Sequence, residues 1–198
     1  MLKSLSGYQG TPVTAQGADA GAITRFAIDL DQWIVRQIAV STETADGQAE
    51  LLISPAAIAG GTDRDGLALA TAPSVHASSA TALEQPERGR LVDSSDLIGA
   101  HIDAVDGSLG HVDDLIVEDD NWHVRYVVVD TRNWWLGKHV LLAPEWIDRF
   151  DAATRTVHVN VNRDAIKDAP EYDAGYLLTR DDEAAVFRHY QRRPYWSA

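Results

Sequence analysis

Histidines and carboxylates are the residues of this chain that could support metal or acid–base chemistry. The chain has seven histidines and no cysteine, which excludes thiolate metal sites, disulfides and cysteine nucleophiles. The histidines lack the spacing of an HExxH zinc motif. His111 and Asp113 would share one face of a strand and, with His101 nearby, form the group that most resembles a zinc site. Because scattered strand histidines are more often packing or surface residues, the sequence alone assigns no metal and no cofactor.

Seven carboxylates and no Lys or Arg fall within residues 103–120. A calcium ion takes roughly six to eight oxygen ligands, but this run does not have the spacing of an EF-hand loop. Asp113 and Asp114 would also point to opposite faces of a strand, so they could not readily chelate together. We interpret the run as a solvated turn or as a negative surface that faces a partner. The candidate contact residues are Asp113, Asp114, Asp119 and Asp120.

A second candidate surface is the loop "RNWWLGKH", which contains Trp134 and Trp135. Neighbouring side chains on a strand face opposite ways, so both rings cannot point into one core. One interpretation is an exposed aromatic anchor for a partner protein, since Trp is frequent at binding hot spots. The other is that one ring caps the sheet and the other covers a neighbouring segment of the chain.

Other classes of function find little support. The sequence contains no GxSxG nucleophile motif, no phosphate-binding glycine loop and no dinucleotide fingerprint, so we expect that it is not an enzyme. The net charge of −13 argues against nucleic-acid binding. No apolar stretch is long enough to cross a bilayer and no signal peptide is recognisable, so we expect a cytoplasmic protein without membrane insertion.

The chain contains an internal repeat with an offset of 89 residues. Between residues 21–58 and 110–147 ten positions are identical without a gap, among them Trp33 with Trp122 and Arg36 with Arg125. Self-similarity of this kind indicates two copies of one fold. We expect the repeated arginines to have a structural role, with a carboxylate as partner.

Short β-rich runs separated by turns make up each repeat. The runs in the first are residues 21–29, 33–41, 49–55 and 66–71, and those in the second are 110–120, 122–130, 138–144 and 156–161. The predicted fold is mostly β, with two tandem small antiparallel β-barrels and a short C-terminal helix. Acids followed by Val186, Phe187 and Tyr190 on one face predict that helix at residues 181–191. The basic and aromatic tail after it would contact a partner or fold back on the same molecule.

These patterns divide the chain into four parts. We expect a first, degenerate repeat at residues 1–75, a small and polar linker at 76–93, a second repeat at 94–175, and the helix and tail at 176–198.

The second repeat resembles the PRC-barrel domain family. The resemblance rests on "LIG", the strand "GHVDDLIV", the strand "YVVVD", the segment "WLGKHVLLAP" and the closing "PEY". It implies a small β-barrel like the cytoplasmic domain of the photosynthetic reaction-centre H subunit and the C-terminal domain of a ribosome-maturation factor. Both examples imply docking without catalysis, of the kind found in bacterial proteins. The first repeat keeps "GAI", "WIVRQIAV" and "LLISP" but lacks the "DD" pair and the tryptophan loop.

We therefore expect a non-catalytic interaction or assembly module that binds a protein partner, with a homo-oligomer as one option for its assembly. One alternative is an H-subunit-like protein that associates with photosynthetic or other electron-transfer complexes. A second alternative is a small-ligand or metal-binding protein that uses His101, His111 and Asp113.

Overall fold

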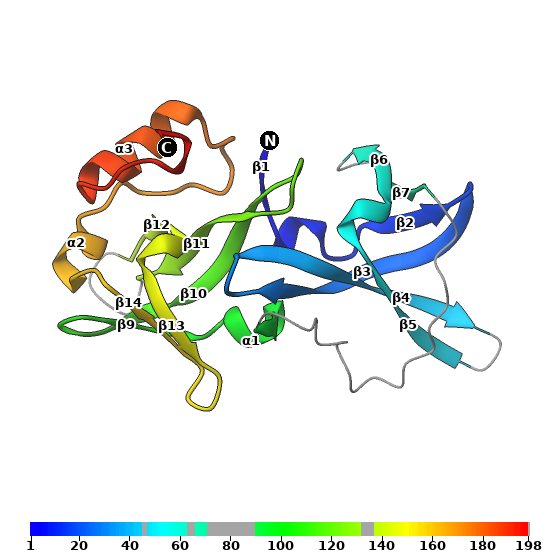
Figure 1. The fold of residues 1–198 in the computed structure, drawn as a ribbon, viewed down its shortest axis with the longest axis horizontal. Coiled ribbons are helices and arrows are strands. Elements are labelled where there is room, and N and C mark those ends of the chain that lie inside the picture. Colours follow the sequence, from blue (N-terminus) through cyan, green and yellow to red (C-terminus); the bar gives the residue numbers. More distant parts are fainter. Residues whose placement is uncertain (45–46, 63–65, 71–89, 132–136, 198) are drawn as a thin grey trace. The chain divides into compact units, whose positions relative to one another are not determined.

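A computed structural model describes residues 1–44, 47–62, 66–70, 90–131 and 137–197 (Figure 1). Most of the expected linker, residues 76–89, lies outside the described residues, as do Trp134 and Trp135. The fold is mostly β and contains two seven-stranded sheets. Each sheet belongs to a compact unit. The N-terminal unit comprises residues 5–95 and 121–123, and the C-terminal unit comprises residues 1–4, 96–120 and 124–198.

The sheet of the N-terminal unit has the order β5-β4-β3-β2-β7-β6, with β8 paired to β3. Its strands are β2 (Pro12–Ala15), β3 (Ala18–Asp29), β4 (Ile34–Thr44), β5 (Gly47–Ile53), β6 (Ile58–Thr62), β7 (Gly66–Leu69) and β8 (Leu91–Asp93).

The sheet of the C-terminal unit has the order β12-β11-β10-β9-β14-β13, with β1 paired to β10. Its strands are β1 (Leu2–Ser4), β9 (His101–Ala104), β10 (Gly107–Glu118), β11 (Val124–Asp130), β12 (His139–Leu142), β13 (Ile147–Asp151) and β14 (Thr156–Val159). The two sheets thus have the same strand order. In each, the third strand of the long meander ends just before a proline that opens a 3-10 helix, Pro55 in one and Pro144 in the other.

One strand pair in each sheet is parallel, β2 with β7 and β9 with β14. The other strand pairs within the described residues are antiparallel, so the sheets are mostly antiparallel, and these two pairs are the exceptions. Strand direction depends on which strands become neighbours, and a local hydrophobic pattern does not contain that information.

Helices and 3-10 turns complete the described chain. They are η1 (Ser6–Tyr8), η2 (Pro55–Ala57), α1 (Ser94–Leu97), η3 (Pro144–Trp146), α2 (Arg163–Lys167), α3 (Arg180–His189) and η4 (Tyr195–Ser197). None of the helices within the described ranges is long and apolar enough to span a membrane.

The seventh strand of each sheet comes from the segment that precedes the other repeat. β1 pairs with β10, with Leu2 opposite Glu118, and β8 pairs with β3, with Leu91 opposite Asp29. The 89-residue offset relates Leu2 to Leu91 and Asp29 to Glu118, so the two strand pairs are equivalent. From the sequence, residues 1–4 were placed in the first repeat and residues 91–93 in the linker, because a pattern identifies a strand without identifying the strand it pairs with.

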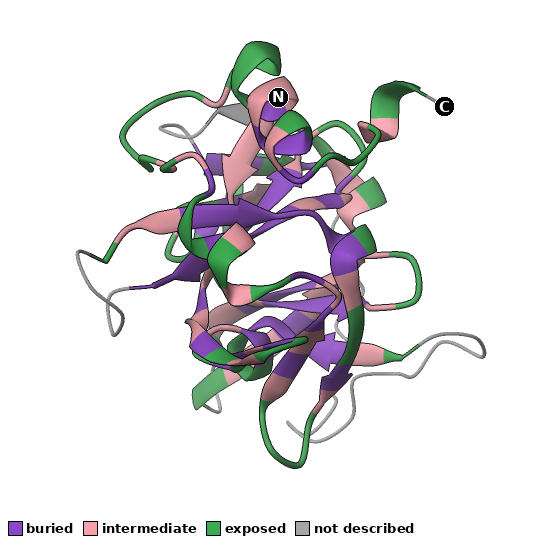
Figure 2. Ribbon diagram, turned by 90° about the vertical axis from the view of Figure 1, so that its left-hand side faces the viewer, coloured by how far each residue is buried: buried purple, intermediate pink, exposed green. Residues whose placement is uncertain are grey.

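Both units have an apolar core beneath their strands (Figure 2). In the N-terminal unit, the ring of Trp122 lies 5.3 Å from that of Tyr8 and 6.3 Å from that of Phe26. Trp122 was expected at the start of a strand, but its φ of 59° places it in a turn, as does the φ of 51° at the equivalent Trp33. In both repeats a tryptophan therefore occupies a left-handed position, which residues other than glycine rarely adopt.

The repeated arginines have the expected carboxylate partners. Arg36 lies 3.0 Å from Asp29, and Arg125 forms the equivalent ion pair with Glu118 at 2.5 Å. Asp29 and Glu118 are also related by the 89-residue offset, so the pair is part of the repeated fold.

Candidate functional site

A β-bulge in β10 positions the first group of polar side chains. His111 of β10 pairs with Asp130 of β11, and the register then shifts by one residue between Val112 and Asp114, so Asp113 is the extra residue. A bulge breaks the regular alternation of side chains and redirects the inserted one. The equivalent shift in β3 falls between Ile23 and Arg25, so the bulge belongs to the fold in both repeats.

Gly110 allows the two strands to approach closely beside this bulge. Its φ is 59°, and a Cβ atom there would lie 2.0 Å from the backbone oxygen of Asp130. Gly21 has the same relation to Ser41 in the first repeat. The identity of these glycines between the repeats thus has a steric cause.

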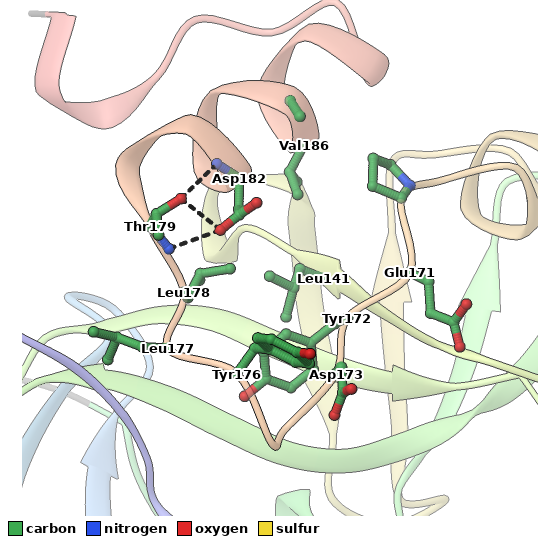
Figure 3. Close-up of a pocket in the computed structure, with 12 residues that line it drawn as sticks. Leu141, Glu171, Tyr172, Asp173, Tyr176, Leu177, Leu178, Thr179, Asp182 and Val186 are labelled. Carbon is green, nitrogen blue, oxygen red and sulfur yellow. Dashed lines mark hydrogen bonds between the residues drawn. The ribbon is translucent and has the colours of Figure 1, made fainter.

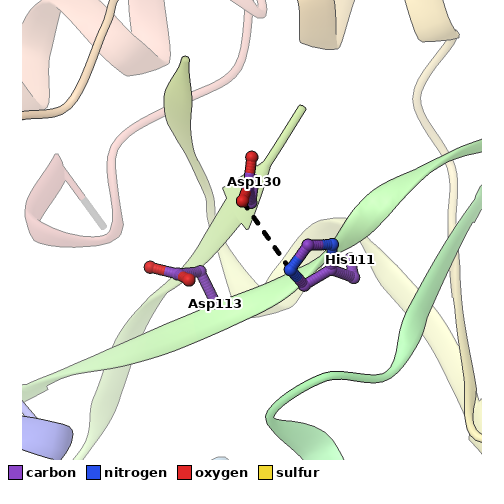
Figure 4. A group of neighbouring side chains, drawn as sticks. All are labelled: His111, Asp113 and Asp130. Atoms are coloured by element: carbon purple, nitrogen blue, oxygen red, sulfur yellow. Dashed lines mark ion pairs between the residues drawn. The ribbon is translucent and has the colours of Figure 1, made fainter. Parts of the chain in front are cut away.

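Three polar side chains, His111, Asp113 and Asp130, meet at this point of the C-terminal unit, and His139 of β12 contacts one of them. Nε2 of His111 lies 3.7 Å from Oδ2 of Asp130, and Nε2 of His139 lies 3.3 Å from Oδ2 of Asp113. One ligand atom from each of His111, Asp113 and Asp130 lies within 4.8 Å of the other two (Figure 4). Asp130 is only 1% exposed, whereas the other three are partly accessible to solvent.

The predicted metal candidates are partly brought together. His111 and Asp113 are in the group, whereas His101, which pairs with His111 across β9 and β10, is exposed and outside it. Sequence reasoning missed Asp130 and His139. The available signal was the polar residue that ends the apolar run "YVVVD", but its position opposite His111 depends on the register.

Two of the four acidic contact candidates hold β1 in place. Asp114 accepts a hydrogen bond from the hydroxyl of Ser4. Asp119 forms an ion pair with the amino group of Met1 and lies 3.2 Å from Nζ of Lys3. Burial opposes ionisation of Asp119, but these two cations outweigh it and lower its pKa below the ordinary value.

The other two candidates differ from these. Asp120 is highly exposed, and Asp113 belongs to the polar group described above. Of the four acidic candidates, two therefore hold β1, one belongs to the polar group and one faces solvent.

A pocket of about 350 Å³ lies in the C-terminal unit between β12, α3 and the segment that joins α2 to α3. The side chains of Leu141, Leu178 and Val186 line it (Figure 3). The backbone of Tyr172 donates a hydrogen bond of 2.8 Å to the carbonyl of His139, which ties the joining segment to β12. Beside the pocket, Tyr176 and Leu177 are 78% and 61% exposed.

The helix that forms one wall of the pocket was expected at residues 181–191 and is found at Arg180–His189. A capping box begins it: the hydroxyl of Thr179 accepts from the backbone of Asp182, and the Asp182 carboxylate accepts from the backbone of Thr179. The predicted apolar face is confirmed, since Val186, Phe187 and Tyr190 are buried.

A buried carboxylate on α3 links the helix to β11 and to the C-terminal tail by hydrogen bonds. Glu183 is 2% exposed, and it accepts hydrogen bonds from the hydroxyls of Tyr126 at 2.7 Å and Tyr195 at 2.9 Å. Burial and the neighbouring Glu183 raise the pKa of Tyr126 far above its ordinary value, so its hydroxyl remains a donor. Arg180 lies 3.0 Å from Glu183 and balances its charge.

The basic and aromatic tail folds back on the same unit. The guanidinium of Arg125 lies 4.3 Å from the ring centre of Tyr195, and that of Arg180 lies 4.3 Å from the ring centre of Trp196. Arg192 donates to the side chain of Asn160 at 3.0 Å. These contacts are with α3, β11 and the residue that follows β14.

Comparison with known families gives a match in the second repeat. The model of the PRC-barrel domain family matches residues 90–166. This range contains the whole polar group of β10–β12 but ends before the segment that closes the pocket. None of the curated proteins matches the chain significantly.

Proposed function

We propose that this chain, whose residues 90–166 match the PRC-barrel domain family model, acts as a non-catalytic protein-interaction module that binds a partner at the pocket beside α3. The observation that carries this proposal is the pairing of an apolar pocket with two large, adjacent and exposed side chains, Tyr176 and Leu177. Exposed apolar groups that border a pocket are typical of binding surfaces. Tyrosine is also enriched among residues that dominate binding energy.

The composition of the pocket rim favours a basic partner segment. Glu171 and Asp173 line the pocket and are exposed. Asp182 also lines it, but its carboxylate is engaged by Thr179. The pocket volume is sufficient for one large apolar side chain. The expected partner thus presents a Leu or aromatic residue flanked by Lys or Arg, which the acidic rim would attract.

Capture of partners from native cells tests this proposal. We expect Leu177→Ser to reduce the amount of captured partner strongly, because it removes exposed apolar surface without disturbing the core. Val105→Ser is the matched control, since Val105 is 64% exposed in the same unit and lies outside the pocket lining. Equal capture by both variants would contradict the proposal, provided that their thermal stabilities agree.

A third variant distinguishes the pocket from the tryptophan loop, which the sequence also offers as a contact surface. If Trp134→Ser/Trp135→Ser abolishes capture and Leu177→Ser does not, the contact belongs to the loop and the pocket proposal is refuted. If Leu177→Ser alone abolishes capture, the pocket is the contact surface.

We further infer that each sheet closes as a small barrel and that the first repeat is a divergent PRC-barrel copy. The support is the shared strand order and the 3-10 helix that connects one end of the strand path to the other in both repeats, η2 and η3. Amide hydrogen exchange tests closure: protection of the outer amides of β12 and β13 would support it. Rapid exchange along both strands would show open edges.

A further inference from the structure

We propose that His111, Asp113, Asp130 and His139 bind one Zn²⁺ ion. The proposal concerns a site that is separate from the pocket lining, and it does not depend on the proposed partner binding.

The spacing of the ligand atoms fits a tetrahedral ion. Zn²⁺ binds His nitrogen and carboxylate oxygen at about 2.0–2.2 Å, so two tetrahedral ligand atoms lie about 3.4 Å apart. The observed separations are 3.3 Å for His139 Nε2 to Asp113 Oδ2 and 3.7 Å for His111 Nε2 to Asp130 Oδ2. One ligand atom from each of His111, Asp113 and Asp130 already lies within 4.8 Å of the other two. His139, whose Nε2 lies 3.3 Å from Asp113 at the edge of this group, would become the fourth ligand through a side-chain movement.

The state of His139 gives a second, independent indication. Its Nε2 atom is buried and makes no hydrogen bond within the described part of the chain, although Asp113 is 3.3 Å away. A buried polar atom without a hydrogen bond is costly unless something else satisfies it. A zinc ion between the four groups would accept the lone pair of this nitrogen.

The first repeat shows that the fold does not require these side chains. The positions equivalent to the four ligands are Ala22, Thr24, Ser41 and Glu50. The hydroxyl of Thr24 donates to a backbone carbonyl in its own sheet, and Glu50 forms an ion pair with Arg25. The bulge and strand register are present in both repeats, but only the second has two imidazoles and two carboxylates at these four positions.

The ligand types favour zinc over calcium or magnesium. Calcium and magnesium prefer oxygen ligands, whereas imidazole nitrogen suits zinc and related transition metals. The carboxylate of Asp130 is almost fully buried, and a divalent cation would compensate its charge together with that of Asp113.

Isothermal titration of the full, chelator-treated chain with ZnCl₂ tests the site. We expect one ion per chain with micromolar or tighter affinity, and a loss of at least about tenfold for His111→Asn and for Asp113→Asn. These two residues are partly exposed, so their variants are expected to fold. Asp130→Asn should weaken binding as well, but a folding defect would make that variant uninformative by itself.

His158→Asn is the matched control. Nδ1 of His158 lies 3.3 Å from Asp103, which gives a His–carboxylate pair in the same unit that belongs to no metal-binding group among the described residues. Co²⁺ provides a second readout, because tetrahedral Co²⁺ absorbs visible light strongly. We expect this absorption in the wild type and in His158→Asn and its loss in His111→Asn.

Three results would overturn the proposal. They are no zinc binding at submillimolar concentration, an equal loss of affinity in His158→Asn and His111→Asn, and calcium binding as tight as zinc binding. The experiment measures metal affinity directly, so its outcome is distinguishable from that of the partner capture.

Discussion

Replacement of Phe187 by Ala is expected to destabilise the C-terminal unit strongly. Phe187 lies on the inner face of α3 with 0% exposure. Its ring centre is 5.3 Å from that of Trp146, 6.3 Å from that of Tyr126 and 5.4 Å from that of Trp196. Removal of the ring leaves a cavity between these aromatic groups, because the sheet and the helix are both held by other contacts and cannot collapse into it.

The expected loss in the free energy of unfolding is about 3–5 kcal/mol, which is typical of a buried Phe→Ala substitution. Leu177→Ala is the control, since Leu177 is 61% exposed and its replacement should change stability by about 0.5 kcal/mol or less. The chain has two units and need not unfold in one step. We would therefore measure urea-dependent hydrogen exchange in peptides from β11 and α3. A loss below about 1 kcal/mol in these peptides would show that α3 does not depend on Phe187 for docking.

Three further predictions follow from local geometry. Gly110→Ala should lower the melting temperature more than Gly10→Ala, because both residues have positive φ but only at Gly110 does a Cβ atom meet backbone, 2.0 Å from the Asp130 oxygen. Equal decreases in melting temperature would show that the positive φ alone, and not the close backbone oxygen, causes the destabilisation. Arg25→Met should cost about 1–3 kcal/mol and increase amide exchange in β8, because Arg25 binds Glu50 and Asp93 together. Unchanged exchange would show that β8 is held by its backbone alone. The hydrogen bonds from Thr179 lower the pKa of Asp182, so the capping box contributes stability above pH ~4 that is lost as pH falls through the folded-state pKa. An Asp182 carboxyl resonance in NMR that titrates at the ordinary Asp pKa would contradict this.

The sequence was sufficient for features that depend on local spacing. The helix at residues 180–189 followed from Val186, Phe187 and Tyr190, whose spacing places them on one helical face. The ion pairs of Arg36 and Arg125 followed from their repetition with the strand, because a charged residue that recurs beside a packed strand needs a partner.

Features that depend on register and on distant pairing could not be predicted. Asp130 joins His111 only because β10 and β11 pair in one register, and Asp113 points to His139 only through the bulge. The pairing of β1 with β10 joins segments more than a hundred residues apart. The pocket has the same origin, because it forms where the segment after the residues that match the PRC-barrel family model returns to Leu141 of β12.

Residue-specific photo-crosslinking tests the central claim most directly. A photoreactive amino acid would replace Tyr176 beside the pocket or, in the control, Val105 on the same unit. We predict that irradiation in native cells produces a discrete crosslinked partner from position 176 and none from position 105, and that Leu177→Ser suppresses it. Crosslinks of equal intensity from both positions, or none from position 176 in a folded protein, would contradict partner binding at the pocket.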